Sequence, residues 1–370
     1  MPDLHALLFA YSSHAHLKEL TQQRNVTSMP FGGRFRVIDF LLSSLVNAGV
    51  HDVGMILREN YQSMLDHVGS GKDWDLARKR GGLMLLPPFA YSSVREHYFR
   101  GEMETLAGIT TYLSRIRNQY VLIADGNLIA NLPIEEAYDA HIDSQADITV
   151  FCANPITKET ANAPYLTLNE NGRVVDVQLG QWDPGSYESL NVAIMGKKVL
   201  NSLVAYCAAR NYFDFNRDIL QAMRDKLDIR GFVFQGYAAK LESVSSYFEH
   251  NMALLQPEVR KALFLKGRPI RTKVRDEASA YYGPEAEVYN SLIADGCYIE
   301  GKVENSILFR GVRVDAGVRI ANSILMQDTH VCKDAVLSYA ITDKEVLINP
   351  GRMLMGHETY PLAIAKGSVV

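Results

Sequence analysis

The feature that most constrains the fold of this 370-residue chain is a short apolar repeat in its C-terminal part. Related tetrads recur at intervals of 15, 17 and 16 residues: Asn290-Ser-Leu-Ile, Asn305-Ser-Ile-Leu, Asn322-Ser-Ile-Leu and Ser338-Tyr-Ala-Ile. A six-residue spacing of aliphatic residues, as in Val312 and Val318, is nested within this period. Such nesting is typical of a β-helix, in which each turn buries its aliphatic corner against the next. The sequence therefore predicts a β-helix over residues 288–370.

Residues 1–255 have a different pattern, in which short β-branched runs alternate with helical segments. Strand candidates include Tyr120-Val-Leu-Ile-Ala124 and Asp147-Ile-Thr-Val-Phe151. The helix candidates are Phe40 to Ala48, Glu102 to Ile116, Ile134 to Asp143, Asp218 to Lys226 and Tyr247 to Leu255. This alternation predicts a mainly parallel sheet covered by helices. Residues 256–287 carry three prolines among charged residues and are predicted to be a connector.

Composition excludes several classes of partner. The net charge is −4 and both signs are spread along the chain, which argues against nucleic-acid binding. No apolar run approaches the length of a membrane span, and the N-terminus lacks a basic region with a cleavage site, so we expect a cytoplasmic protein. The four cysteines are far apart without CxxC spacing, which argues against zinc and against a disulfide framework. They are Cys152, Cys207, Cys297 and Cys332.

A second informative segment lies near the N-terminus, where the apolar run Ala6-Leu-Leu-Phe9 precedes Ala10-Tyr-Ser-Ser-His-Ala-His16. A strand that presents a nucleoside triphosphate to a transferase normally opens into a glycine-rich loop. Only glycine lets backbone N–H groups approach phosphate without obstruction by a side chain. Residues 10–16 contain no glycine.

Later residues carry a family resemblance. Leu20-Thr21, Arg24, Pro30-Phe-Gly-Gly-Arg-Phe-Arg-Val-Ile-Asp-Phe40 and Val46-Asn47-Ala48-Gly49 resemble the start of bacterial glucose-1-phosphate adenylyltransferases, the ADP-glucose synthases of glycogen formation. In that family a Rossmann-like α/β nucleotidyltransferase domain precedes a left-handed β-helix of hexapeptide repeats used in assembly. The resemblance covers nearly the whole chain, and it implies the same fold class here.

The resemblance also identifies departures from the family pattern. Tyr11, Ser12 and His14 stand at the glycines of the phosphate loop, and His16 stands at its arginine. Lys240 stands at a metal-binding aspartate, where we expect its ammonium to lie within about 4 Å of Asp125 and hold that carboxylate ionised. The lysine that holds glucose 1-phosphate is absent from Leu179-Gly-Gln181. The retained pocket positions are Gly101, Asp125 and Ser189.

These departures predict a degenerate active site in residues 1–255. The family uses magnesium, but with one carboxylate replaced we expect no metal or other cofactor. A metal pair formed by His14 and His16 is disfavoured because no third ligand is near in sequence.

Cations near intact family residues are candidates for a phosphate-bearing effector. Arg34 and Arg36 flank Phe35 beside a Gly-Gly pair. The other candidates, Lys72, Arg78, Lys79 and Arg80, lie in a glycine-bracketed segment that could equally contact a partner chain or form a solvated basic surface.

The resemblance favours a regulatory-type subunit that joins catalytic subunits, as part of a hetero-tetramer, and tunes their activity through a sugar-phosphate effector. One alternative is an active adenylyltransferase with an unusual donor loop. The other is a hexapeptide-repeat acyltransferase, which would use an exposed histidine between coils. His330 has no obvious partner in the sequence for that role.

Overall fold

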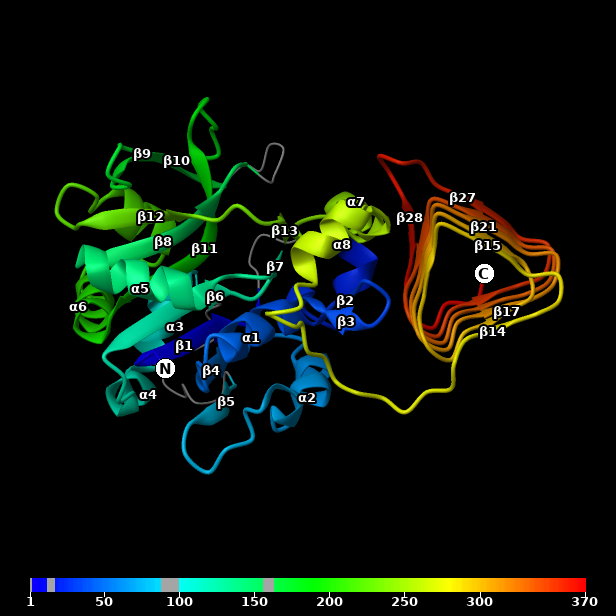
Figure 1. Ribbon diagram of the computed structural model, residues 1–370, viewed down its shortest axis with the longest axis horizontal. Coiled ribbons are helices and arrows are strands. Elements are labelled where there is room, and N and C mark those ends of the chain that lie inside the picture. Colours follow the sequence, from blue (N-terminus) through cyan, green and yellow to red (C-terminus); the bar gives the residue numbers. More distant parts are fainter. Residues whose placement is uncertain (1, 12–16, 88–99, 156–162) are drawn as a thin grey trace. The chain divides into compact units, whose positions relative to one another are not determined.

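The computed structural model describes residues 2–11, 17–87, 100–155 and 163–370 (Figure 1). The chain forms two compact units. The first consists of Met1–Ser13, Phe40–Arg58 and Gly69–Lys240, and the second of His14–Asp39, Glu59–Val68 and Leu241–Val370. The second unit therefore contains two short N-terminal segments in addition to the C-terminal repeat. Family positions Ser12, His14 and His16 lie outside the described residues.

The first unit is built on a nine-stranded sheet whose main path runs β10-β9-β11-β6-β1-β4-β5. Its central strands β1 (Leu4–Phe9), β4 (Asp52–Ile56), β5 (Gly82–Leu86) and β6 (Tyr120–Asp125) are parallel to one another. The long strand β11 (Tyr187–Gly196) pairs antiparallel with β6, β8 (Ile148–Ala153) and β9 (Pro164–Leu168). The remaining members are β10 (Val174–Leu179) and β12 (Ile229–Val233). A separate antiparallel pair joins β7 (Leu128–Ala130) to β13 (Ala238–Lys240).

Helices cover this sheet, as the alternating pattern predicts. They are α3 (Glu102–Gly108), α4 (Thr110–Arg115), α5 (Ile134–Ser144), α6 (Lys197–Ala208) and the main part of α1 (Val37–Asn47). Helix α6 buries Leu200, Leu203, Val204 and Cys207, which recur every three to four residues and so share one face. Two helix predictions need correction. The predicted 102–116 helix ends at Ile109 and restarts as α4, and the predicted 218–226 helix is a π-helical segment over Asn216–Gln221.

The second unit contains the β-helix, whose strands form three parallel five-stranded sheets. The first consists of β14 (Tyr281–Tyr282), β17 (Tyr298–Ile299), β20 (Arg313–Val314), β23 (His330–Val331) and β26 (Leu347–Ile348). The second consists of β15 (Glu287–Tyr289), β18 (Lys302–Glu304), β21 (Arg319–Ala321), β24 (Val336–Ser338) and β27 (Met353–Met355). The third consists of β16 (Leu292–Ile293), β19 (Ile307–Leu308), β22 (Ile324–Leu325), β25 (Ala340–Thr342) and β28 (Leu362–Ile364).

The repeated asparagines turn the chain at one corner of each coil. Asn290, Asn305 and Asn322 have φ values of 42°, 44° and 46°, in the left-handed region that asparagine tolerates better than most residues. The serine after each one extends the corner. Ser306 donates its hydroxyl to the Glu304 carbonyl at 2.6 Å, and its oxygen accepts the N–H of Ser323 on the next coil at 3.1 Å. The asparagine and serine of these tetrads therefore mark a corner, and aliphatic residues within the tetrads, such as Leu308, and between them, such as Val312, fill the interior.

The rest of the second unit combines the two N-terminal segments with helices that follow Lys240 in the chain. It comprises α2 (Gln62–Val68), α7 (Val244–Met252), α8 (Pro257–Leu263) and the hairpin of β2 (Pro30–Phe31) with β3 (Phe35–Arg36). Tyr247 of α7 donates its hydroxyl to the Pro30 carbonyl at 2.7 Å, and Asn251 accepts the Gly32 N–H at 2.9 Å. Within the described ranges, none of the helices is both long and apolar enough to cross a bilayer.

Candidate functional site

A small pocket in the first unit lies where strands β6 and β11 face the start of α3. Asp125, the last residue of β6, lines it, and so do Ser189 and Asn191 of β11. Two acidic groups, Asp125 and Glu102, face the pocket, whereas its described lining residues include no lysine or arginine. The other lining residues are Phe9, Ile123, Ala124, Val150, Val192, Ala193, Phe215 and Asn216.

The sequence analysis did not predict Glu102 as a pocket residue. Its position is set by the preceding residue, Gly101. Gly101 has an extended backbone, and a Cβ there would lie 2.2 Å from the Phe213 carbonyl oxygen, so any side chain is excluded. This close approach brings the first turn of α3 against the loop before the π-helical segment. The Glu102 carboxylate accepts the N–H of Phe215 at 3.4 Å. In the sequence, the signal that could have identified Glu102 is its position directly after a glycine that tolerates no side chain.

The two carboxyl groups hold protons unusually tightly. Burial, with a smaller contribution from the Asp125 carboxylate, raises the pKa of Glu102 to about 8. Burial also raises the pKa of Asp125 to about 6, although the Lys240 ammonium and a hydrogen bond from Asn191 Nδ2 at 3.0 Å act in the opposite direction. Desolvation penalises the ionised forms more than these partners favour them. The pocket is therefore poorly suited to a phosphate group, which would meet two acids and, among the described lining residues, no lysine or arginine.

Lys240 does not pair with Asp125, and this part of the prediction is wrong. Its ammonium donates to Glu188 Oε1 at 2.9 Å and to the Ser189 carbonyl at 2.7 Å. Both charged side chains are buried, with 2% of Lys240 and none of Glu188 exposed. The Lys240 ammonium pairs with Glu188 because two charges buried away from water need direct contact to offset the cost of their desolvation. Glu188 comes from β11, a strand whose pairing the sequence did not specify.

Tyr11 stands at a family glycine and occupies that position with a buried side chain. Its hydroxyl lies 2.9 Å from Thr105 Oγ1, and the Arg58 guanidinium lies 4.5 Å from the centroid of its ring. Only 7% of Tyr11 is exposed. The packed ring of Tyr11 anchors the backbone at a position where the family pattern predicts glycine, which has no side chain to pack.

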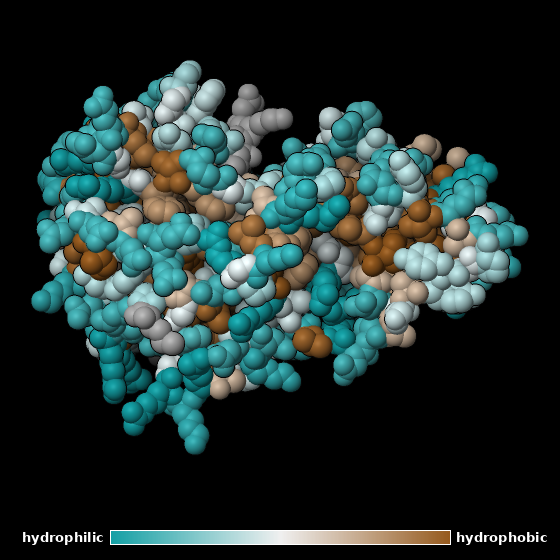
Figure 2. Space-filling model, in the orientation of Figure 1, coloured by the Kyte–Doolittle hydropathy of each residue, from teal (hydrophilic) through white to brown (hydrophobic). Residues whose placement is uncertain are grey.

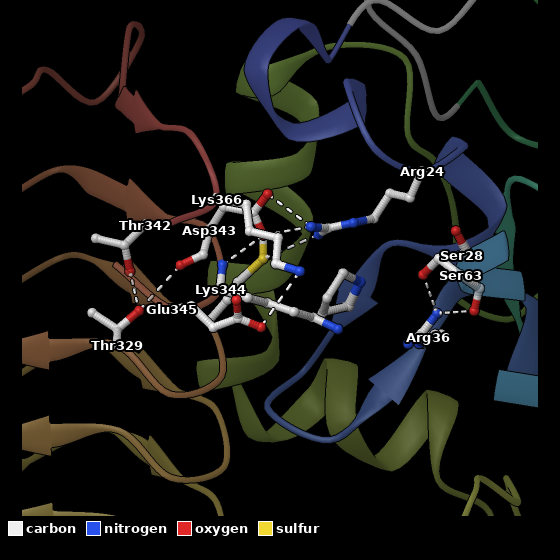
Figure 3. A network of polar contacts seen from close by, with 12 residues as sticks. Arg24, Ser28, Arg36, Ser63, Thr329, Thr342, Asp343, Lys344, Glu345 and Lys366 are labelled. Atoms are coloured by element: carbon white, nitrogen blue, oxygen red, sulfur yellow. Dashed lines mark hydrogen bonds and ion pairs between the residues drawn. The ribbon is translucent and has the colours of Figure 1, made fainter. Parts of the chain in front are cut away.

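The predicted effector cations fall into two groups. Lys72, Arg78, Lys79 and Arg80 are exposed in the first unit, where Arg78 forms an ion pair with Asp75. Arg34 and Arg36 belong to the second unit. Arg34 is exposed, whereas Arg36 is partly buried and donates to the Ser63 carbonyl at 2.6 Å and to its hydroxyl at 2.7 Å (Figure 3).

Arg36 is one of several cations that gather in the second unit beside the β-helix. Arg24 donates from Nη2 to both oxygens of Asp343 at 2.8 Å, and both side chains are buried (Figure 3). Burial and the nearby Arg36, Arg24 and Arg275 lower the pKa of Lys344 to about 7. Burial likewise lowers the pKa of Arg36 to about 10, and Arg24 and Arg275 add to this effect. Asp343 offsets only part of this positive charge.

Comparison with known proteins decides the family. The nucleotidyl transferase family model matches residues 13–253, and the model for the GlmU-like C-terminal hexapeptide matches residues 276–359. The glycogen biosynthesis protein GlgD of Bacillus subtilis (strain 168) is 34% identical over 95% of this chain and 93% of that protein. The glucose-1-phosphate adenylyltransferase of Bacillus mycoides (strain KBAB4) is 32% identical over 94% of each chain. The chain belongs to the GlgD and glucose-1-phosphate adenylyltransferase family.

Membership confirms the predicted fold class, a nucleotidyltransferase domain followed by a left-handed β-helix of hexapeptide repeats. It also supports a role in glycogen biosynthesis. The magnesium used by this family is not matched by the residues present. Under the correspondence that the resemblance predicts, Asp125 is retained, whereas the second carboxylate position falls on Lys240, whose ammonium pairs with Glu188. An ammonium cannot ligate a cation, so no step of a reaction is assigned to magnesium here.

Proposed function

We propose that this chain is a regulatory subunit of glucose-1-phosphate adenylyltransferase with little or no turnover of its own. The observation that carries the proposal is the buried pair of Lys240 with Glu188, which places a satisfied ion pair where the family needs a metal ligand. The described lining of the pocket is acidic and holds no lysine or arginine, which points the same way, because stabilising a phosphoryl transition state requires cations. This role belongs in the cytoplasm, beside a catalytic subunit with which the chain would form a hetero-tetramer.

The test is ADP-glucose formation by the purified full chain, alone and mixed with the catalytic subunit. We expect no turnover from the chain alone and a changed rate or effector response in the mixture. The matched control is the catalytic subunit at the same concentration without this chain. ADP-glucose formation by the chain alone at a rate like that of the catalytic subunit would favour the alternative, an active enzyme with an unusual donor loop.

The β-helix is the proposed assembly surface. In Figure 2 hydrophilic residues cover most of the visible face, interrupted by apolar patches. Among the exposed large apolar side chains, Tyr289, Met353, Met355 and Tyr360 are each at least 65% exposed and belong to the β-helix region. Apolar groups left in water favour association. Because the N-terminal segments fold with the β-helix in one unit, point substitutions such as Met353→Glu test this better than truncation after residue 287.

The cations around Arg36 and Lys344 support a second role, binding of a phosphate-bearing effector. Burial lowers the pKa of both groups, and neighbouring arginines lower it further, so positive charge adds to the cost of their protonated forms. A bound anion would offset that charge and form charge-assisted hydrogen bonds. We expect the affinity for inorganic phosphate or a sugar phosphate to fall as pH rises through 7, because Lys344 then loses its proton.

The effector site is tested by calorimetric titration of the full chain with those ligands. Arg36→Met and Lys344→Met should each weaken binding, whereas Lys79→Met, in the exposed basic segment of the first unit, should not. Equal loss in all three variants would indicate nonspecific attraction to positive charge.

A further inference from the structure

A cluster of three potential metal ligands lies on the β-helix. Strands β20 and β23 pair in parallel with Arg313 opposite His330 and Val314 opposite Val331. Asp315 and Cys332 follow directly, so they stand at equivalent positions on successive coils. Val314 and Val331 are fully buried. Because side chains alternate along a strand, the residues on either side of Val331 face outward together.

The three side chains converge on a single point. His330 Nε2 lies 3.1 Å from Asp315 Oδ2 and 4.0 Å from Cys332 Sγ. All three potential ligand atoms lie within 4.8 Å of one another. Ligand atoms around a tetrahedral ion with bonds of about 2.0–2.3 Å are about 3.3–3.8 Å apart, so small rotamer adjustments would complete the shell.

The geometry distinguishes a metal shell from a nucleophilic relay. In a cysteine–histidine–aspartate relay, the thiol and the carboxylate contact opposite ring nitrogens. Here both approach the same nitrogen, Nε2 of His330. An acyltransfer role for His330 through such a relay is therefore not supported by the arrangement.

We propose that Asp315, His330 and Cys332 bind one Zn²⁺ ion and so link two successive coils. A thiolate, an imidazole and a carboxylate form a ligand set that suits zinc rather than magnesium or calcium, which prefer oxygen ligands. The thiolate and the carboxylate together balance the charge of the ion. Arg313 Nε lies 3.2 Å from Asp315 Oδ1, which orients the carboxylate and leaves Oδ2 directed at the histidine.

This site was not expected from the sequence, where the spacing of the cysteines argued against zinc. The ligands lie 15 and 17 residues along the chain from Asp315, which is about one coil. Three protein ligands leave a fourth position for water, and His330 is 36% exposed, so an ion can reach the cluster from solvent.

The experiment is titration of the metal-stripped full chain with Zn²⁺ against a chromophoric chelator. We expect one competing site per chain, with affinity reduced about tenfold or more in Cys332→Ser and in His330→Gln. His357→Gln, at an exposed histidine elsewhere in the β-helix region, should bind like the wild type. Asp315→Asn provides an independent variant if the cysteine substitution impairs folding.

A second readout identifies the ligands directly. The Co²⁺-loaded chain should show the absorption of a tetrahedral ion with a thiolate-to-metal band, and Cys332→Ser should lose that band. Zn²⁺ should also raise the melting temperature of the wild type and of His357→Gln, but not of Cys332→Ser or His330→Gln. Equal zinc affinity in wild type, Cys332→Ser and His330→Gln, or Co²⁺ spectra without a thiolate band, would overturn the proposal.

Discussion

The buried pair of Lys240 and Glu188 replaces the contact between Lys240 and Asp125 that the sequence predicts. Each charge would be costly without the other, because neither side chain reaches water. From the family pattern alone, Lys240 is simply a lost metal ligand. The structure shows that it has a partner of its own, the Glu188 carboxylate. Restoring an aspartate at position 240 would place two acids side by side at Glu188, so a single reversion is not expected to restore a metal site.

We predict that Lys240→Ala destabilises the chain by about 3–5 kcal/mol, because it leaves the Glu188 carboxylate buried without its cation. Lys240→Met combined with Glu188→Leu should recover most of this loss, since no charge is then buried. Urea unfolding of the wild type, Lys240→Met, Glu188→Leu and the double variant measures the coupling. A loss in the double variant equal to the sum of the single losses would show that the two charges do not interact.

At the scale of elements, the corner asparagines give the β-helix its repeat. Each adopts a left-handed backbone conformation that costs most residues about 1–2 kcal/mol. The fourth corner uses Tyr339 instead, with φ of 49°. There the tetrad loses its asparagine, and the ring of Tyr339 lies 6.1 Å from that of Phe248, which adds a packing contact.

Asn322→Ala should destabilise the chain by about 1–2 kcal/mol, because alanine has no side-chain hydrogen bond to compensate its left-handed backbone. Asn322→Gly should cost less, since glycine adopts positive φ without steric penalty. Both are measured by urea unfolding at constant pH. If alanine proves no worse than glycine, the side chain of Asn322 rather than its backbone conformation sets the corner.

At the scale of the whole molecule, the second unit joins distant parts of the chain around buried charge. Arg24 and Asp343 are 319 residues apart in sequence and form a contact at 2.8 Å. Lys344 lies next to this pair, and its pKa of about 7 is far below its ordinary value of 10.5. Between these two pH values the folded state binds fewer protons at this lysine than the unfolded chain does.

The free energy of unfolding should therefore rise with pH between about 7 and 10.5 by up to about 1.4 kcal/mol per pH unit from Lys344. Lys344→Met should remove this part of the pH dependence, and below pH 7 it should be the more stable of the two. Lys333→Met, at an exposed lysine of the β-helix, is the control and should keep the wild-type slope. Parallel pH profiles for wild type and Lys344→Met would contradict a lowered lysine pKa.

The sequence by itself determined the elements that depend on local pattern. Aliphatic periodicity and corner asparagines specify the β-helix because each coil repeats the same short-range geometry, and alternating strand and helix patterns specify the sheet of the first unit. Motif resemblance predicted Gly101, Asp125 and Ser189 as pocket positions, and the structure places Asp125 and Ser189 in the pocket lining. The first strand of the β-helix, at Tyr281, begins within the segment predicted as a connector, because a two-residue strand carries too little periodicity to be recognised.

Only the tertiary structure decided which side chains meet. Glu188 of β11 contacts Lys240 of β13, although the two strands belong to different sheets. Glu102 faces the same pocket as Asp125 because Gly101 allows a close approach of the backbone to Phe213. Arg24 meets Asp343, and His330 meets Asp315 and Cys332, through contacts between residues on different segments or coils. Local pattern fixes backbone periodicity, whereas charge pairing and ligand geometry depend on distances between segments that the sequence does not encode locally.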